Sequence, residues 1–237
     1  MTNFVLVHGA FHGGWCWKLV VEELESRGHQ AVVLDLPGSG DDQTPLEDVS
    51  RDAAVERVVE TITSLNGPVV LVAHSMGGVV ITQVADRVPE LIDRLVYVAA
   101  FRPQDGESLL DLAARPEGAG DQVQANLTIE GNPPVAKFDA TMAKEVLYHD
   151  CPDDLARWAV EHLRPHPLSV DVTPVSLSRG AFAPTDYVVC TEDHATPIPL
   201  QRFMSTRDPA RVFELASSHS PFLSRPQELV DILVSDS

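Results

Sequence analysis

The sequence has few basic residues and no long apolar run. Its 237 residues include 17 Lys and Arg against 35 Asp and Glu, which gives a formal net charge of −18 at pH 7. This balance repels nucleic-acid phosphates and anionic bilayers, so we expect neither as a partner. No apolar run reaches the roughly 18 residues that a membrane-spanning helix needs, and residues 1–9 carry no basic stretch. Neither a membrane span nor a cleavable signal peptide is therefore predicted.

Cysteine is also scarce, and motifs for metals and nucleotides are missing. The three cysteines, Cys16, Cys151 and Cys190, are odd in number and widely spaced, which favours reduced thiols over a disulfide framework. The chain contains no CxxC pair and no HExxH motif, and it lacks both the GxGxxG and the GxxxxGK[ST] pattern. We therefore expect a cytoplasmic protein without a bound metal or cofactor.

Short Val-rich segments alternate with stretches of helical periodicity along much of the chain. Five apolar segments are typical of strands buried on both faces of a parallel sheet: residues 3–7, 31–35, 68–73, 95–99 and 186–191. Helical periodicity lies between the first four, in residues 15–27, 46–64 and 76–88. This alternation predicts an α/β fold with a doubly wound, mostly parallel sheet.

The alternation stops between residues 102 and 185, a stretch rich in proline and polar clusters. Helical patterns recur there near residues 140–148 and 152–163, and the strand pattern resumes at Asp186. A further short strand, residues 211–215, and a closing helix, residues 227–234, follow. We interpret 1–101 and 186–237 as the core, and 102–185 as a helical cap insertion over the carboxyl edge of the sheet.

One serine lies where an apolar strand runs directly into a helix, in the segment VVLVAHSMGG of residues 69–78. A nucleophile elbow needs small residues two positions before and after its serine, and here these are Ala73 and Gly77. Ser75 is the candidate nucleophile, and the amide of Met76 would point at a developing oxyanion. The alternative is that Ser75 is an ordinary helix N-cap.

A glycine-rich loop, HGAFHGGW, follows the first strand. Acyl transfer needs a second backbone N–H near the serine, and Ala10 is the candidate. A phosphate-binding loop is the alternative, but the glycine spacing does not fit it. His8 and His12 are interpreted as loop histidines that bond the backbone and shape the turn.

The base and its acid are expected near the C-terminus. His219 lies in the small-residue loop SSHS, after a short strand and before the last helix, as a Ser…Asp…His order requires. Asp193 ends an earlier strand and is the candidate acid. Asp105, which follows the strand ending near residue 99, is the main rival. A helix cap or a solvated loop charge is the alternative role for either aspartate.

Four segments, HGAFHGGWCW, AHSMGG, VVCTEDHATP and SSHSPFLSRPQEL, together resemble the α/β-hydrolase superfamily. They are most similar to the branch that holds the plant methylesterases, among them the salicylate-binding esterases, and the (S)-selective hydroxynitrile lyases. The resemblance implies the α/β-hydrolase fold, with Ser75 as nucleophile, Asp193 as acid, His219 as base, and an oxyanion hole formed by the amides of Ala10 and Met76.

Two positions favour the esterases of this branch over the lyases. One lyase type places a threonine at the position of Gly9 and a lysine directly after the catalytic histidine, where this chain has Ser220; a second type places an asparagine at the position of Gly9. Without the lysine, nothing obvious stabilises a departing cyanide. We therefore expect a serine carboxylesterase acting on small, methyl or aryl esters. The alternatives are a C–C lyase, a tailoring methylesterase for bulky polyketide-like substrates, and a non-catalytic receptor for a small acid.

Apolar side chains near the loop and in the cap are candidate substrate contacts. The first group comprises Phe11, His12, Phe101 and Trp158. Phe138, Leu147 and Leu163 are further candidates, and packing of the cap against the sheet is the alternative role for these three and for Phe101 and Trp158. The expected partner is a small-molecule ester, and the apolar helix faces are also compatible with a homodimer.

Overall fold

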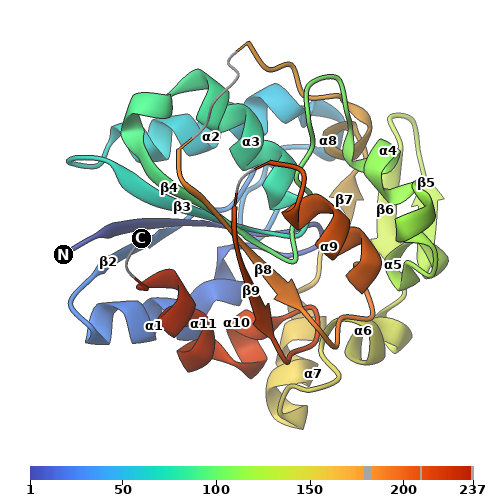
Figure 1. Ribbon diagram of the computed structural model, residues 1–237. Coiled ribbons are helices and arrows are strands. Elements are labelled where there is room, and N and C mark those ends of the chain that lie inside the picture. Colours follow the sequence, from blue (N-terminus) through green and yellow to red (C-terminus); the bar gives the residue numbers. More distant parts are fainter. Residues whose placement is uncertain (179–182, 209, 236–237) are drawn as a thin grey trace.

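Six parallel strands form the central sheet of the computed structural model, which describes residues 1–178, 183–208 and 210–235 (Figure 1). The strands are β1 (Asn3–Val7), β2 (Gln30–Val33), β3 (Val69–His74), β4 (Ile92–Val98), β8 (Thr185–Cys190) and β9 (Arg211–Leu215). They lie in the order β2-β1-β3-β4-β8-β9, and every neighbouring pair is parallel. The predicted doubly wound α/β sheet is confirmed.

Helices cover both faces of the sheet, which explains the continuous apolar runs in the strands. Alternate residues point to opposite faces, so Val5 and Leu71 join one buried cluster while Leu6 and Val70 join the other. Helices α2 (Arg51–Thr63) and α3 (Gly77–Arg87) pack on the first side, and α1 (Lys18–Ser26) and α11 (Pro226–Leu233) pack on the second. All six residues of β3 are buried as a result.

The strand order reverses between β1 and β3. The chain leaves β1 for β2 on one side and returns to form β3 on the other side of β1. The loops that follow β1 and β3 therefore diverge at their carboxyl ends and leave a crevice, the place where open α/β sheets bind ligands. Ser75 and the glycine-rich loop both lie at this crevice, because one follows β3 and the other follows β1.

The segment between β4 and β8 contains both helices and a small sheet. Its helices are α4 (Leu109–Ala113), α5 (Gln122–Ala125), α6 (Ala140–Leu147), α7 (Asp153–His162) and α8 (Ser169–Val172). Its strands are β5 (Leu127–Glu130), β6 (Val135–Phe138) and β7 (His166–Pro167), which form an antiparallel sheet in that order.

The expectation of a purely helical cap was therefore incomplete. Strands β5 and β6 are four residues each; β5 is largely exposed and β6 has a single buried residue, Ala136, so both lack the buried apolar run by which the core strands were found. Residues 179–182 of the expected cap, and 209 and 236–237 of the expected core, lie outside the described residues.

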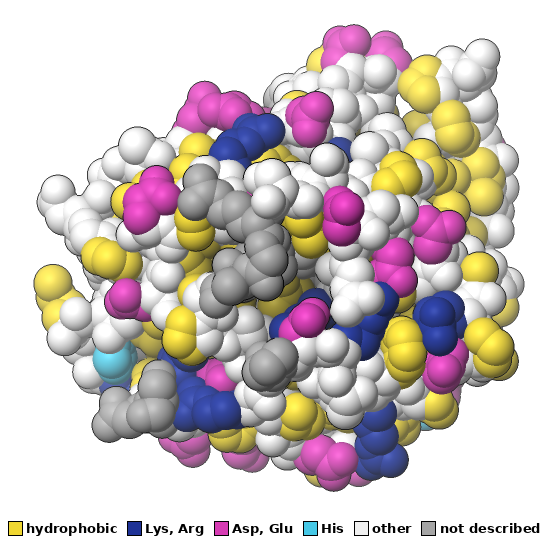
Figure 2. Space-filling view, turned by 45° about the horizontal axis from the view of Figure 1, so that its top comes forward, with side chains coloured by type: hydrophobic (Ala, Val, Ile, Leu, Met, Phe, Trp, Pro, Cys, Tyr) yellow, Lys and Arg dark blue, Asp and Glu magenta, His cyan; other side chains and the backbone are white. Residues whose placement is uncertain are grey.

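Two further helices complete the carboxyl-terminal part, α9 (Ile198–Ser205) and α10 (Pro221–Ser224). Among the described residues, no helix is both long and apolar enough to cross a bilayer. Acidic side chains are spread over the face seen in Figure 2, as the strongly negative net charge leads one to expect.

Candidate active site

Ser75 occupies a sharp turn between β3 and α3. Its φ is +51°, in the left-handed region that costs an ordinary residue about 1–2 kcal/mol. The turn is possible because Gly77 and Gly78 leave room: a Cβ on Gly77 would lie 2.6 Å from the carbonyl oxygen of His8, and one on Gly78 would overlap that of Phe101. A non-glycine residue held at positive φ between a strand and a helix is the geometry of a nucleophile elbow.

The loop after β1 runs directly against this elbow. A Cβ on Gly9 would lie 2.8 Å from Cβ of Ser75 and 2.8 Å from Nδ1 of His74, so only glycine allows the backbone to come so close. Ala10 follows Gly9, and Ala10 and Met76 line the same cavity as Ser75. Two backbone segments that could each supply an N–H to an oxyanion therefore flank the serine.

The carboxylate of Asp193 is buried and accepts hydrogen bonds on both oxygens. Oδ1 accepts from the amides of Ala195 (2.7 Å) and Thr196 (3.0 Å). Oδ2 accepts from Nε2 of Gln201 at 2.8 Å and lies 2.7 Å from Nδ1 of His219. A carboxylate that already takes three other donors remains an acceptor toward Nδ1–H, which leaves Nε2 of His219 as the basic nitrogen.

His74 links this acid–base pair to the elbow. Its Nε2 donates to the carbonyl oxygen of His219 at 2.8 Å, and the two rings lie 4.4 Å apart between centroids. His219 therefore lies beside the residue that precedes Ser75. Burial, followed by the nearby His219, lowers the pKa of His74 well below its usual value, so His74 stays neutral and does not oppose a charge on His219.

The rival acid lies elsewhere. Asp105 is exposed, and its Oδ1 accepts from the amide of Leu177 at 2.8 Å, whereas the Nδ1 of His219 bonds Asp193. The structure brings Asp193, rather than Asp105, to His219.

A family comparison agrees with this geometry. The model of the Alpha/beta hydrolase family matches residues 4–232. The chain belongs to the alpha/beta hydrolase family.

Relatives of this α/β hydrolase include both esterases and a lyase. Methylesterase 7 of Arabidopsis thaliana is 32% identical over 98% of this chain and 95% of its own length. Alpha-hydroxynitrile lyase of the same plant is also 32% identical, with the same coverage of both chains. Two longer chloroplastic relatives from A. thaliana are matched over only 55% and 63% of their own length. Among solved structures, polyneuridine aldehyde esterase is similar, with a TM-score of 0.89, 25% identity, and coverage of 99% of this chain and 98% of its own.

The cavity beside the serine of this α/β hydrolase is narrow, about 40 Å³. Two of the expected contacts, Phe11 and Phe101, line it. The other lining residues were not foreseen: Leu109, Asp121, Val123, Gln124, Leu127, Ala136, Asp171 and Thr196. Most of these come from the cap, whose position over the sheet no local pattern reveals; only Thr196, three residues past Asp193, had a nearby signal.

His12 does not line the cavity of Ser75. Its Nδ1 donates to the carbonyl oxygen of Ala10 at 2.8 Å, so its Nε2 accepts from the hydroxyl of Tyr148 at 2.7 Å. Burial lowers the pKa of His12 to about 3. His8 is held in the same way: Nδ1 donates to the carbonyl oxygen of Gly9, Nε2 accepts from the amide of Leu36, and burial lowers its pKa to about 4. Both are neutral histidines that fix the loop, as their structural interpretation predicted.

Trp158, another expected contact, does not line this cavity either. It packs edge-on against Trp15 at 5.2 Å and lines shallow surface hollows with Lys18, outside the cavity of Ser75. Ala156 and Ala159 of α7 lie in the buried cluster on the α1 side of the sheet, so helical periodicity identified a packing face of α7. Phe138 and Leu147 likewise pack in the interior, where Phe138 contacts Phe11 at 5.8 Å between ring centroids.

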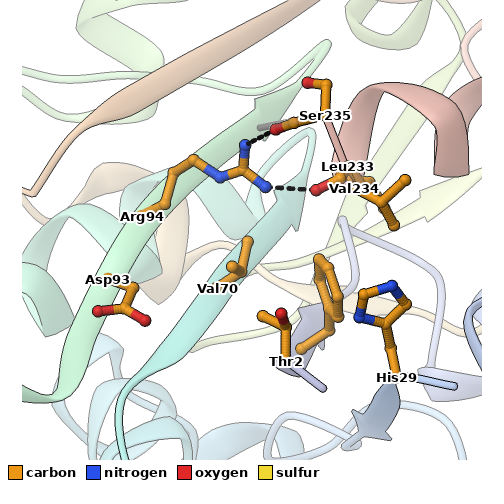
Figure 3. Close-up of a pocket in the computed structure, with 9 residues that line it drawn as sticks. Thr2, His29, Val70, Asp93, Arg94, Leu233, Val234 and Ser235 are labelled. Atoms are coloured by element: carbon orange, nitrogen blue, oxygen red, sulfur yellow. Dashed lines mark hydrogen bonds between the residues drawn. The ribbon is translucent and has the colours of Figure 1, made fainter. Parts of the chain in front are cut away.

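A larger hollow of about 370 Å³ lies at the opposite edge of the sheet (Figure 3). Thr2, Val70 and Asp93 line it near the amino ends of β1, β3 and β4, and Arg94 donates there to the carbonyl oxygens of Leu233 and Ser235. These bonds tie the end of α11 to the sheet. The hollow is remote from Ser75, so its greater size does not make it the active site.

Proposed function

We propose that this chain is a serine carboxylesterase that hydrolyses small carboxylic esters, with methyl and aryl esters as the first candidates. The observation that carries the proposal is the Asp193–His219 hydrogen bond beside a serine held at positive φ in a strand–helix elbow. The methylesterase and esterase relatives support the same reaction class.

The reaction proceeds through an acyl-enzyme. Nε2 of His219 takes the hydroxyl proton of Ser75 as Oγ attacks the ester carbonyl, and Asp193 stabilises the imidazolium. The amides of Ala10 and Met76 bind the oxyanion, each lowering the barrier by about 3 kcal/mol. The C–O bond to the alcohol then breaks, and the alcohol leaves with the proton from His219. Water next attacks the acyl group while His219 takes its proton. The bond to Oγ of Ser75 breaks, His219 returns the proton to Ser75, and the acid is released.

The surroundings of the triad favour hydrolysis over cyanide release. At position 9 a Cβ would require the loop or Ser75 to shift, so the site has no room for the threonine or asparagine that the lyases carry there. Ser220, buried and uncharged, follows His219 in place of the lysine. With no cation at that position, the alcohol of an ester is the better leaving group for this site.

The size of the cavity favours a small ester over a bulky polyketide-like one. A space of about 40 Å³ admits a short acyl or alkyl group without movement of the cap. A receptor that merely binds a small acid has no need of the buried Asp193–His219 pair, which costs folding free energy to desolvate.

Hydrolysis of p-nitrophenyl esters from acetate to octanoate tests the proposal, with wild type and Ser75→Ala compared. We expect rates that fall with chain length in the wild type and vanish in the variant. A folded wild type that cleaves cyanohydrins and leaves every ester intact would replace this proposal with the lyase.

A cytoplasmic location is also proposed. Cys16, Cys151 and Cys190 are all buried and free, as suits a reducing compartment. Loss of activity on secretion through an oxidising compartment, compared with cytoplasmic expression of the same chain, is the expected result.

A further inference from the structure

The cavity that Ser75 lines has acidic groups in its wall. Two carboxylates, Asp121 and Asp171, contribute to its wall, and no Lys or Arg does so among the described residues. The rest of the wall is largely apolar, so the field of an acidic group there is weakly screened.

The two carboxylates differ in how far neighbours neutralise them. Oδ1 of Asp171 lies 3.0 Å from Nε2 of His166. Arg51 is a second basic neighbour: burial lowers the pKa of its guanidinium to about 10, and the nearby charge of Asp171 opposes that shift. In the part of the chain that the structure describes, no Lys, Arg or His forms an ion pair with Asp121. Its Oδ1 accepts from the amide of Gln124 at 3.0 Å.

Asp121 also lies within electrostatic reach of the triad. Burial raises the pKa of its carboxyl, the amides of Gln124 and Val123 oppose that shift, and His219 and Asp193 act on it through their charges. Asp121 and Ser75 line the same cavity, so the carboxyl group is near enough to act on a charge carried by a bound ester.

Helix capping alone does not account for an aspartate here. Asp121 is the N-cap of α5, and asparagine or serine caps a helix about as well. Either would avoid the desolvation of a carboxylate in an apolar cavity. Helix capping therefore does not explain why the residue at position 121 carries a charge.

We propose that Asp121 selects substrates by charge, favouring esters that carry an ammonium or similar cation and discriminating against those with a second carboxylate. The inference rests on the proposed esterase function and adds the substrate class. A cation beside Asp121 gains a partner in a poorly solvated cavity, whereas an added carboxylate meets the carboxylate of Asp121, which forms no ion pair with a basic residue among the described residues.

The test compares two methyl arylacetates of equal size, one with a para-aminomethyl group and one with a para-carboxylate. We expect wild type to give the higher kcat/KM for the cationic ester. Asp121→Asn, which retains the cap, should lower the cation-to-anion ratio of kcat/KM by about tenfold or more, as expected for loss of one partly buried charge partner.

Asp139→Asn is the matched control. Asp139 caps α6 in the same segment, its Oδ1 accepts from the amide of Thr141 at 2.9 Å, and it does not line the cavity. This variant should keep the wild-type ratio. An unchanged ratio in Asp121→Asn, or an equal change in Asp139→Asn, would overturn the inference while leaving the esterase proposal intact.

Failure of the esterase proposal would be seen separately, as absence of hydrolysis of both esters and of p-nitrophenyl acetate. Binding then decides the role of Asp121: calorimetry with benzylamine and with benzoate is done on Ser75→Ala and on the same variant with Asp121→Asn. We expect the second substitution to weaken benzylamine at least about tenfold relative to benzoate. Equal affinities in the two proteins would refute charge selection.

Discussion

Replacing Asp193 by asparagine changes one oxygen of the buried carboxylate into an NH₂ group. The remaining oxygen is best placed toward the amides of Ala195 and Thr196, since both can only donate. The new NH₂ group then faces Nε2 of Gln201 and Nδ1 of His219, which are also donors in the wild type. His219 relieves this conflict by moving its proton from Nδ1 to Nε2.

In that tautomer His219 cannot accept the proton of Ser75. Loss of the correct tautomer in a Ser-His-Asp triad costs about 10⁴-fold in kcat, or about 5 kcal/mol of barrier. The donor of Gln201 is left without its acceptor, which lowers the free energy of unfolding by about 1–3 kcal/mol. The kinetic loss thus exceeds what partial unfolding can cause.

The assay is kcat for p-nitrophenyl acetate, together with urea unfolding and the ¹⁵N shifts of His219. Asp105→Asn makes the same chemical change at the exposed rival, whose Oδ1 bonds only a loop amide, and should leave kcat within about twofold. A folded Asp193→Asn enzyme with more than a tenth of wild-type kcat, or a larger loss in Asp105→Asn, would refute the reasoning.

Three further outcomes are expected. Gly9→Ala places a Cβ 2.8 Å from that of Ser75 and should reduce kcat/KM about 10²–10³-fold, the cost of one oxyanion donor; unchanged kinetics at unchanged Tm would count against the placement of the loop. The pKa of His8 is about 4 when folded and about 6.5 when unfolded, so the neutral side chain stabilises the fold fully above pH 6.5, and this stabilisation is lost as pH falls toward 4. Between pH 7 and pH 4, the free energy of unfolding from urea titrations should fall by about 3 kcal/mol more in the wild type than in His8→Gln. Parallel pH curves for the two proteins would contradict this. Tyr148→Phe removes the donor to the buried Nε2 of His12 and should lower the free energy of unfolding by about 1–3 kcal/mol, whereas no change in the denaturation midpoint would argue against that bond.

Local sequence signals were enough for the parts of the site that depend on local structure. The elbow requires small residues at fixed offsets from Ser75, and the strands of the core carry apolar residues without interruption, so both leave a pattern in the chain. Asp193 could be preferred to Asp105 because it ends the strand before that of His219, and the structure brings those two side chains within 2.7 Å.

The cap lacked such signals. Its strands are short and lack a continuous buried apolar run, and the helix face that lines the cavity depends on how the cap packs on the sheet. Trp158 has the apolar character expected of a pocket residue, yet it lies outside the cavity of Ser75. Asp121 has the polar character of an exposed helix N-cap, yet it lines that cavity. Long-range packing decides both, and a single sequence does not encode it in any local period.

The position of the inserted segment in the chain has a consequence for folding. Ser75 and the loop after β1 precede it, whereas Asp193 and His219 follow it. Strand β4 pairs with β8 across the whole inserted segment, for example Leu95 with Thr185. Strands β1 to β4 can pair while later residues are still being synthesised, but contacts so distant in sequence form slowly. The nucleophile therefore stays inert until the last two strands dock. During refolding, recovery of esterase activity should lag behind recovery of helical circular dichroism, which makes turnover a sensitive reporter of the completed sheet.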